Sequence, residues 1–331
     1  MSDRHHWGIA ATGRIAGIFA RDLALLDTAD LVAVGSRSSE RAEEFGSRFN
    51  VPHRHGSYDA LADDPDVEIV FVASPVTSHH TDVLRFLRAG KHVLTGKPLA
   101  VNATQSRDMV TAAAERRLFL MEGMWNRFLP SYVALREILA AGRIGTPLFV
   151  DADFGAALPF DPTHRLFDPA VGGGALRNMA IYPLQLAQMV LGPVSMSVAT
   201  GVIGASGVDE TITAAVEHRG GGRSVSKASL SIDFACEARI TGTAGHIDLP
   251  KYMHKPKYFD VTNSDGTVRV DAPFDGVGLH FQAAEVQACI AADETQSKVM
   301  PWDETIRLAE LMDDCRDQIG SRQSRATKAI P

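Results

Sequence analysis

The chain has 331 residues, 45% of them hydrophobic, and a formal net charge of −7 at pH 7. This length and composition predict two domains with sizeable cores. The acidic balance and the lack of a basic run argue against nucleic acid or an anionic membrane as a partner. No apolar stretch approaches the roughly 20 residues of a membrane span, and the start of the chain, MSDRHH, lacks the apolar core of a signal peptide.

Cysteine and histidine usage narrows the class of protein further. Cys236, Cys289 and Cys315 show no C-x-x-C spacing, and this pattern is typical of a reducing, cytoplasmic compartment. The 12 histidines show no H-E-x-x-H or other familiar ligand spacing. We therefore expect no bound metal.

Residues 1–121 alternate short apolar strands with amphipathic helices, which predicts a doubly wound parallel sheet covered on both faces. The expected strands are Trp7–Ala11, Ala29–Gly35, Ile69–Ala73, His92–Leu94 and Phe119–Met121. The expected helices are Ile15–Leu26, Glu40–Phe49, Thr81–Arg88 and Thr104–Arg116.

Residues 122–331 have a different texture and are expected to form a second, α+β domain. Long alternating segments predict a mostly antiparallel sheet, at Leu148–Phe154, Val194–Val202, Thr211–His218, Ser224–Ile232, Ala235–Thr241, Tyr258–Thr262 and Thr267–Val270. Helices are expected at Gly174–Leu191, Phe281–Ala292 and Thr305–Ile319, the last being a candidate for packing back on the first domain. No low-complexity linker separates the domains, so we expect an active site in the cleft between them.

The turn after the first strand has the form of a dinucleotide phosphate loop. Aligned on G-x-G-x-x-G/A, the chain places Ala11, Gly13 and Ala16 at the three small positions. The second position matters most, because a side chain there would hold the backbone away from the pyrophosphate. The N–H groups that open the following helix would then meet the phosphates. The predicted cofactor contacts in this turn are Ala11, Thr12, Gly13, Arg14 and Ile15, with an ordinary βα turn as the alternative interpretation.

The end of the second strand predicts which dinucleotide is bound. A carboxylate at this point selects NAD through the ribose 2′-hydroxyl, whereas an arginine accommodates a 2′-phosphate. The chain has Ser36 and Arg37 there, no carboxylate between Leu31 and Ser39, and Arg41 one helical turn later. A guanidinium is planar, always charged and matched to phosphate. The predicted cofactor is therefore NADP.

Several further stretches carry a resemblance to a known family. They are GIAATGRIA at 8–16, AVGSRS at 33–38, ASPVTSH at 73–79, GKHVLTGKPL at 90–99, MEGMWNRF at 121–128, RLFDP at 165–169 and GGGAL at 172–176. In this order the chain resembles the glucose–fructose oxidoreductase/inositol dehydrogenase (Gfo/Idh/MocA) family, nearest to its dimeric dihydrodiol dehydrogenase and NADP-dependent pyranose dehydrogenase branch. The resemblance implies an N-terminal Rossmann domain, a C-terminal domain on a large open sheet, and hydride transfer between nicotinamide and a sugar-like or cyclic alcohol.

The resemblance also implies two catalytic residues. The family's Glu-Lys-Pro motif falls on Gly96-Lys97-Pro98, so Lys97 matches the lysine near the nicotinamide ribose, where an ammonium stabilises a developing alkoxide and lowers the pKa of a neighbouring acid. Tyr182 matches the tyrosine that exchanges the hydroxyl proton. The chain departs from the family at Gly96, usually glutamate, and at Asn178, usually aspartate. The alternatives are a surface lysine at Lys97, a core tyrosine at Tyr182 and, for Asn178, a structural asparagine near a glycine-rich helix start.

Other positions are implied with less chemical detail. Ser74, Pro75 and His79 match a loop that covers the cofactor, although a Ser-Pro turn is also ordinary loop chemistry. Arg127 is matched to a cofactor contact and Trp125 to a substrate contact, with interface packing as the alternative for the tryptophan. The remaining predicted substrate contacts are Asn178, Arg165 and Phe281.

The functional prediction is an NADP-dependent oxidoreductase that transfers hydride between nicotinamide and a carbinol of a sugar, polyol or cyclic diol. The alternative is an NADP(H)-binding sensor without turnover, suggested by the neutral Gly96 and Asn178. A large antiparallel sheet with helices on one face leaves the other face exposed, so at least a homodimer through the C-terminal sheet is expected.

Overall fold

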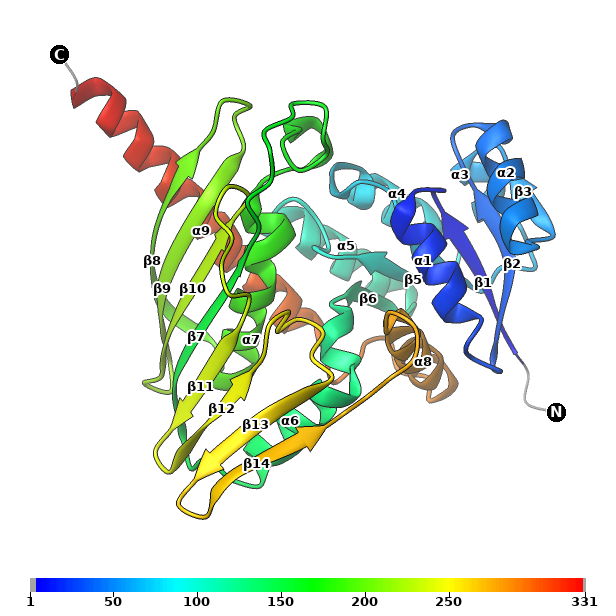
Figure 1. Cartoon of the computed structure of the whole chain (residues 1–331). Coiled ribbons are helices and arrows are strands. Elements are labelled where there is room, and N and C mark those ends of the chain that lie inside the picture. The colour runs from blue at the N-terminus through cyan, green and yellow to red at the C-terminus, as the bar shows by residue number, and fades with distance from the viewer. Residues whose placement is uncertain (1–3, 330–331) are drawn as a thin grey trace. The chain divides into compact units, whose positions relative to one another are not determined.

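The structure is a computed structural model in which residues 4–329 are described, with side chains as far as Gly320. The chain divides into two compact units (Figure 1). Unit 1 comprises Met1–Leu129 and Asp275–Ile306, and unit 2 comprises Pro130–Phe274 and Arg307–Pro331. No helix in the described part of the chain is both long enough and apolar enough to cross a bilayer.

Unit 1 contains a six-stranded parallel sheet in the order β3-β2-β1-β4-β5-β6. Its strands are β1 (His5–Ala10), β2 (Ala29–Gly35), β3 (His53–His55), β4 (Ile69–Val72), β5 (His92–Gly96) and β6 (Leu120–Gly123). This is the strand order of the Rossmann fold, in which the ligand binds at the carboxyl ends of the strands where the order reverses, between β1 and β4. The expectation of a Rossmann domain is confirmed.

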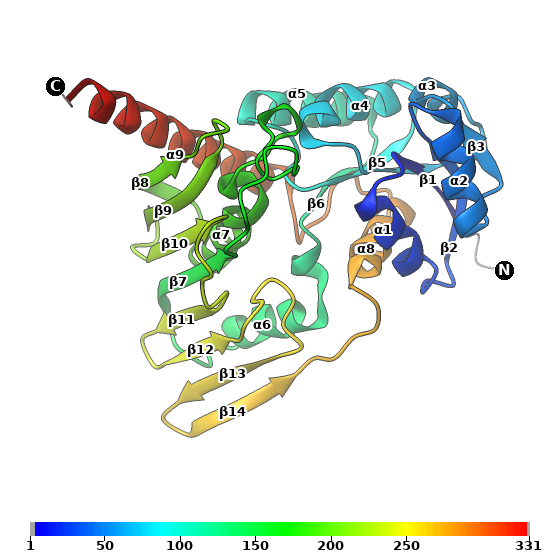
Figure 2. The same ribbon diagram turned by 45° about the horizontal axis from the view of Figure 1, so that its top comes forward.

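Helices cover both faces of this sheet (Figure 2). They are α1 (Arg14–Leu23), α2 (Ser39–Phe49), α3 (Tyr58–Ala62), α4 (Val76–Arg88), α5 (Ala103–Arg116), the short 3-10 helix η1 (Trp125–Phe128) and α8 (Leu279–Ala291). All four residues of β4 are buried, as expected of a strand packed on both faces. One core cluster joins Val70 and Val72 of β4 to Phe86 of α4 and Met109 of α5.

The sequence predicts a domain boundary after residue 121 and therefore places Asp275–Ile306 in the second domain. The structure places this segment in unit 1. In the structure the carboxylate of Asp22, at the end of α1, accepts the N–H groups of Gly278 and Leu279 at 2.8 and 2.7 Å. These are N–H groups at the start of α8, which have no partner inside their own helix. A cap supplied 256 residues earlier in the chain cannot be recognised from local sequence.

Unit 2 is built on an eight-stranded sheet in the order β14-β13-β12-β11-β7-β10-β9-β8, antiparallel except for the pair β7–β10. The strands are β7 (Pro147–Gly155), β8 (Val194–Ile203), β9 (Asp209–His218), β10 (Arg223–Ser229), β11 (Ala238–Gly242), β12 (Gly245–Leu249), β13 (Tyr258–Asn263) and β14 (Gly266–Asp271). Helices α6 (Pro130–Ala140), α7 (Ile181–Leu191) and α9 (Trp302–Ala329, from Arg307 onward in unit 2) lie on one face (Figure 2). The predicted large, mostly antiparallel sheet is confirmed.

The helix expected over Gly174–Leu191 differs from the structure at its start. Gly174 has a φ of +109°, outside the helical region. A π-helical turn, η3 (Leu176–Ala180), follows it and leads into α7 at Ile181. Single π turns are frequent at functional sites, and Tyr182 lies directly after this one. Strands β3 and β12 and helices α3 and α6 were not predicted.

Candidate functional site

The turn between β1 and α1 has the geometry of a phosphate loop. Ala11, at the first small position of the motif, has a φ of +95°, a conformation that favours glycine and that side chains rarely adopt. Gly13 is the N-cap of α1, and no side chain caps this helix. A Cβ atom at Gly13 would meet nothing within 4 Å, so the space over the helix start is open. An uncapped helix N-terminus beneath open space fits the pyrophosphate of a dinucleotide.

Two arginines predicted to contact the cofactor lie just after β2 and in the first turn of α2. Arg37 and Arg41 are both exposed, and neither forms an ion pair with any described residue. Ser36 is buried, and its Oγ accepts the N–H of Ser38 at 3.3 Å. Ser38 in turn caps α2 by accepting the N–H of Arg41 at 3.3 Å. The turn is therefore held by its serines, while both guanidinium groups are left available to a ligand.

His79 joins two loops at the carboxyl end of the sheet. Its Nε2 lies 2.9 Å from the carbonyl oxygen of Ser74, and its Nδ1 lies 3.0 and 3.2 Å from those of Pro98 and Leu99. A neutral imidazole carries one N–H, so both contacts are hydrogen bonds only when the ring is protonated. Burial lowers the pKa of His79, while the three carbonyls and Asp82 oppose that shift. His79 is 2% exposed, and its contacts hold the turn that carries Lys97 against the loop that contains Ser74.

The turn itself follows β5. Lys97 is partly buried and precedes Pro98 through a cis peptide bond. A Cβ atom at Gly96 would come no closer than 3.6 Å to any neighbour, so a side chain fits there sterically. A lack of space therefore does not explain why Gly96 stands where the family usually has glutamate. The substitution changes the chemistry of this position by removing a carboxylate.

Glu122 supplies a carboxylate near Lys97 that sequence reasoning did not single out. It lies in β6, is 3% exposed, and its Oε1 accepts the N–H of Leu99 at 3.2 Å. Burial raises the pKa of Glu122 to about 7, against the opposing effects of a hydrogen bond from Thr305 and of the nearby Arg127 and Lys97 charges. Glu122 therefore both holds the turn after Lys97 and interacts electrostatically with its ammonium.

Replacing Glu122 with glutamine should change how stability depends on pH. The pKa of Glu122 rises from 4.5 to about 7 in the folded state, so the folded state binds this proton more tightly. The free energy of unfolding of the wild type is then lost as pH rises between these two values, by about 2 to 3 kcal/mol from near pH 5 to near pH 8. Glutamine keeps an acceptor for Leu99 and does not titrate.

The measurement is urea unfolding of both proteins near pH 5 and near pH 8. The variant should gain stability over the wild type only at the higher pH. Identical pH dependence in the two proteins would show that Glu122 is ionised normally.

The segment after β6 contains two predicted site residues, Trp125 and Arg127, which differ in how far they are buried. Trp125 is partly buried at the start of η1. Arg127 is 1% exposed, pairs with Glu304 and donates to the carbonyl oxygen of Val299 at 2.9 Å. These contacts fasten η1 to the second segment of unit 1. The partly buried Phe281 belongs to α8 and thus also to unit 1, where its ring packs on that of His280 with centroids 4.0 Å apart.

Tyr182 lies in unit 2, in the first turn of α7, and is 6% exposed. Its ring centroid is 5.6 Å from that of Phe154 on β7 and 4.9 Å from that of His254. The rings of Phe154 and His254 stack at 4.6 Å. His254 was not predicted, because it follows β12 in a loop with no motif. A residue far away in the sequence holds the loop that carries His254: the hydroxyl of Tyr132 donates to the carbonyl oxygen of Met253 at 3.0 Å.

Asn178 and Arg165 come together, as two predicted substrate residues should, but their contacts are those of a turn. The side-chain amide of Asn178 donates to the carbonyl oxygens of Gly172 and Gly174 at 3.1 and 2.8 Å. Its oxygen accepts from Arg165 at 3.1 Å. Asn178 thus holds the glycine turn that leads into η3. An asparagine is well suited to this work because it both donates and accepts.

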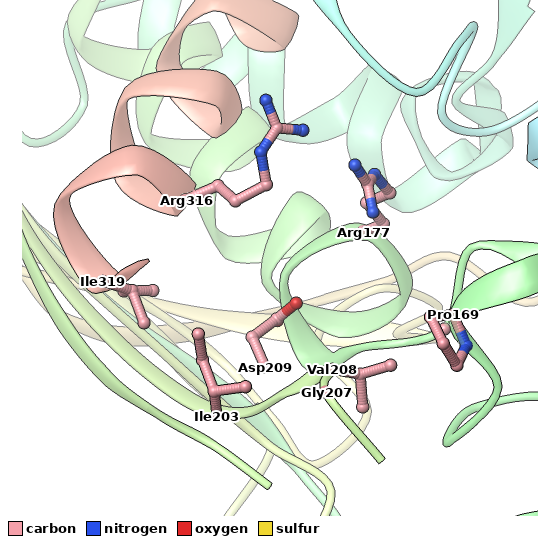
Figure 3. Close-up of a pocket in the computed structure, with 9 residues that line it drawn as sticks. Pro169, Arg177, Ile203, Gly207, Val208, Asp209, Arg316 and Ile319 are labelled. Atoms are coloured by element: carbon pink, nitrogen blue, oxygen red, sulfur yellow. The ribbon is translucent and has the colours of Figure 1, made fainter. Parts of the chain in front are cut away.

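A pocket of about 120 Å³ in unit 2 has Gly173 of this turn in its lining, and Figure 3 shows most of the other residues that line it. Arg177 and Arg316 line it together with Asp209. Asp209 accepts the N–H of Leu176 at 2.5 Å, and burial raises its pKa to about 6, against this hydrogen bond and the two arginine charges. The pocket contains none of the predicted site residues. The partly buried carboxylate of Asp209 holds the start of η3 through the N–H of Leu176.

Comparisons with known proteins agree with the two-part architecture. Residues 5–124 match an oxidoreductase family with an NAD-binding Rossmann fold, and residues 132–248 match the GFO/IDH/MocA C-terminal domain. The chain is 36% identical over 328 residues to trans-1,2-dihydrobenzene-1,2-diol dehydrogenase of Mus musculus, covering 95% of this chain and 96% of the mouse protein. The Xenopus laevis protein of the same name is 33% identical over 327 residues, covering 95% of this chain and 98% of that protein.

A solved structure is also similar to this chain along nearly its whole length. A 3-ketoreductase from Actinomadura kijaniata, in complex with NADP and TDP-benzene, is similar with a TM-score of 0.84 at 25% identity, covering 96% of this chain and 98% of that one. Both halves of the chain and its relatives lead to one assignment: the chain belongs to the Gfo/Idh/MocA oxidoreductase family.

Proposed function

We propose that the protein is an NADP-dependent dehydrogenase or reductase acting on a CH–OH group of a cyclic diol or sugar. The observation that carries this proposal is the aromatic environment of Tyr182, whose phenol is flanked by the rings of Phe154 and His254. Flat side chains suit a flat or ring-shaped substrate. The similarity to diol dehydrogenases along 95% of the chain supports the same substrate class.

The proposed proton transfer uses Tyr182. In the oxidative direction its deprotonated oxygen takes the proton of the substrate hydroxyl as the carbinol becomes a carbonyl, and in the reductive direction it returns that proton. Lys97 is proposed to favour the deprotonated phenol through its positive charge and to stabilise negative charge on the substrate oxygen. NADP, when bound, accepts or supplies the hydride.

The proposed cofactor contacts come from unit 1 alone. Residues 11–15 would hold the pyrophosphate, and Ser36, Arg37 and Arg41 the 2′-phosphate. Ser74 and Pro75 remain proposed contacts in the loop after β4. We leave out His79 and Arg127, because their side chains are 2% and 1% exposed and engaged by other groups of the protein.

The sensor alternative is weakened by two contacts. It depends on the missing acidic groups at Gly96 and Asn178. Glu122 provides a carboxylate that interacts with Lys97 from a different strand, and Asn178 has a structural task in the turn before η3. Enzymatic turnover is therefore the function we propose.

The experiment is a spectrophotometric screen at about 340 nm, where the reduced nicotinamide absorbs. Purified protein receives NADP or NAD with cyclic trans-diols, aldoses and inositols, and NADPH with the corresponding carbonyl compounds. We expect turnover with NADP and one of these classes. NADPH binding without turnover on any member of the panel would contradict the enzyme and favour the sensor.

We also propose a homodimer through the open face of the sheet in unit 2. On the covered face, the hydroxyl of Ser197 of β8 accepts from the side chain of Gln318 of α9 at 3.4 Å, and Ala199 is fully buried. Val198 therefore points to the other face, where it is exposed beside its register partner Ala215. The face also carries the exposed Phe149, Met196 and Val202. Burying such apolar side chains against a second copy is favourable.

Val198→Asp should convert the dimer to a monomer by placing a charge in this interface. Light scattering should give twice the 35.7 kDa chain mass for the wild type and the chain mass for the variant. Leu25→Asp, at an exposed leucine of unit 1, is the matched control and should stay dimeric. A monomeric wild type at micromolar concentration would overturn the proposal.

A further inference from the structure

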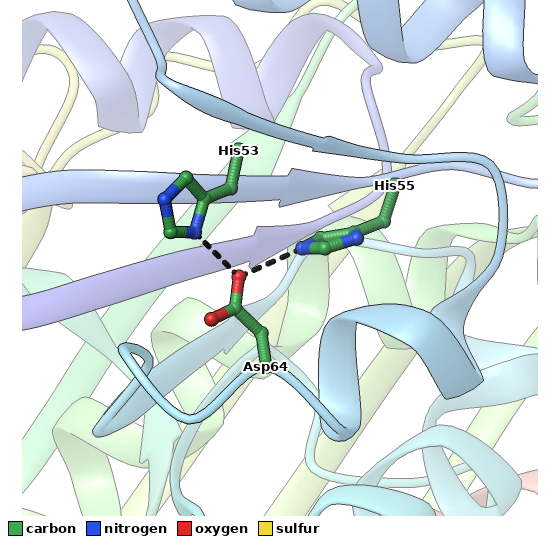
Figure 4. Close-up of side chains that lie close together, drawn as sticks. All are labelled: His53, His55 and Asp64. Atoms are coloured by element: carbon green, nitrogen blue, oxygen red, sulfur yellow. Dashed lines mark hydrogen bonds and ion pairs between the residues drawn. The ribbon is translucent and has the colours of Figure 1, made fainter.

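Strand β3 presents two histidines to a buried carboxylate (Figure 4). His53 and His55 are two residues apart on a strand, so their side chains share one face. Arg54 between them points elsewhere and bonds to Glu43 at 2.8 Å. Asp64 follows α3 and approaches the two imidazoles from the neighbouring loop. None of the three residues of this cluster is among those proposed for the reaction.

The ligand atoms of the cluster converge. Oδ2 of Asp64 lies 2.8 Å from Nδ1 of His53 and 2.8 Å from Nε2 of His55. The three atoms lie within 4.8 Å of one another. Two neutral imidazoles facing one carboxylate oxygen offer the two nitrogens and one oxygen that a small metal ion takes.

Asp64 is held in position by hydrogen bonds to groups other than the two histidines. Oδ1 of Asp64 accepts the N–H of Asp66 at 3.0 Å, and its backbone carbonyl accepts from the buried Nζ of Lys91 at 2.7 Å. Both imidazoles keep partial access to solvent, with side chains 37% and 22% exposed. A fixed carboxylate with two accessible imidazoles allows an ion to enter without rearranging the backbone.

An outer carboxylate completes the arrangement. Nε2 of His53 lies 3.8 Å from Oδ2 of Asp66. Histidines that bind metals through one nitrogen usually donate the N–H of the other to a carboxylate, a carbonyl or water. Metal binding at Nδ1 would move the ring proton of His53 to Nε2, which already faces Asp66, with no net proton released from a neutral ring.

We propose that His53, His55 and Asp64 bind one divalent transition-metal ion of the zinc class, with water as the remaining ligand. Two imidazoles and a single carboxylate favour zinc and its neighbours in the periodic table over magnesium or calcium, which require oxygen ligands. This proposal departs from the expectation of no metal, which relied on the absence of H-E-x-x-H or any other familiar ligand spacing. Here the ligands are two residues apart on a strand, with the third nine residues later.

The proposed ion would tie β3 to the loop after α3, close to the cofactor region. The carbonyl of His55, a ligand residue, accepts the N–H of Ser36 at 3.0 Å. Ser36 is among the proposed 2′-phosphate contacts. An ion on the imidazole of His55 would therefore brace the strand that supports this turn.

The test is titration of the full-length, EDTA-treated protein with zinc, and with cobalt(II) as a coloured substitute. We expect one equivalent to bind with a Kd of about 10 μM or tighter, a visible cobalt absorption band, and a higher melting temperature. His53→Gln and His55→Gln should each weaken binding at least about tenfold. None of these readouts depends on enzymatic turnover, so the result is independent of the proposed function.

His5→Gln is the matched control. His5 lies at the start of β1, 2.9 Å from Glu68, and no third ligand joins that pair among the described residues. The control should bind zinc as the wild type does. Asp64→Asn is a further variant, and His53→Gln keeps the test valid if that protein fails to fold. Failure to bind zinc saturably below about 1 mM, or equal binding by the wild type and both histidine variants, would overturn the proposal.

Discussion

Tyr182→Phe is expected to lower kcat by about 10²- to 10⁴-fold, the usual contribution of a positioned acid or base. The variant removes only the hydroxyl. Phenylalanine keeps the ring that packs on Phe154 and His254 at 5.6 and 4.9 Å, so the fold of this region should be retained. Because the proposed cofactor contacts are in unit 1, the affinity for NADPH should not change. The measurements are steady-state kinetics and NADPH fluorescence titration.

Tyr252→Phe is the control for this result. Tyr252 is exposed, and its ring also lies near that of His254, at 6.3 Å. It should keep the kcat of the wild type. If Tyr182→Phe turned over every accepted substrate at the wild-type rate, the proton-transfer assignment would be wrong. A parallel loss of NADPH affinity would instead indicate a structural role for the hydroxyl.

Features defined by neighbouring residues could be predicted from the sequence. The phosphate loop is an example, since Ala11 and Gly13 occupy their motif positions and the structure gives them a positive φ and an uncapped helix start. Arg37 likewise lies exposed at the end of β2, where the sequence places it, and its contact with a 2′-phosphate stays a prediction. In each case a short segment of backbone determines both the conformation and the chemistry.

Features that depend on distant partners could not be predicted. Glu122 interacts with Leu99 and Lys97, which lie in the turn after β5, more than twenty residues earlier in the chain. The cap of α8 by Asp22 moved a whole segment from the predicted second domain to unit 1. A side chain whose partner is remote in sequence leaves no periodic or spacing signal.

Asn178 shows a third case, in which the sequence left a structural role open beside a substrate contact, and the structure gives contacts of the structural kind. Its position before Tyr182 suggested a substrate contact. The glycines at 172 and 174 create a turn whose carbonyl groups need donors, and the amide of Asn178 provides them. The need arises from the backbone conformation of that turn, with φ of +81° and +109° at the two glycines, which sequence spacing does not specify.

Arg37→Ala should weaken NADP binding by about 10- to 100-fold and leave NAD binding unchanged. Charge-assisted hydrogen bonds contribute about 1.5 to 3 kcal/mol each, and about 1.4 kcal/mol corresponds to a tenfold change in affinity. Arg37 is exposed and forms no ion pair with a described residue, so its removal leaves no unpaired partner in the protein. Titration calorimetry with NADP and NAD, at low and moderate salt, measures both affinities.

The control tests whether local charge alone explains the result. Arg48→Ala removes an exposed arginine near the far end of α2, the helix that follows Arg37, where the guanidinium lies over the ring of Phe49. It should change neither affinity. Ser36→Asp should act in the opposite sense, because a carboxylate at the end of β2 accepts from a ribose 2′-hydroxyl and repels a 2′-phosphate. If Arg37→Ala weakened both cofactors equally, the arginine would be contacting a group that NADP and NAD share, and the preference for NADP would have to come from elsewhere in unit 1.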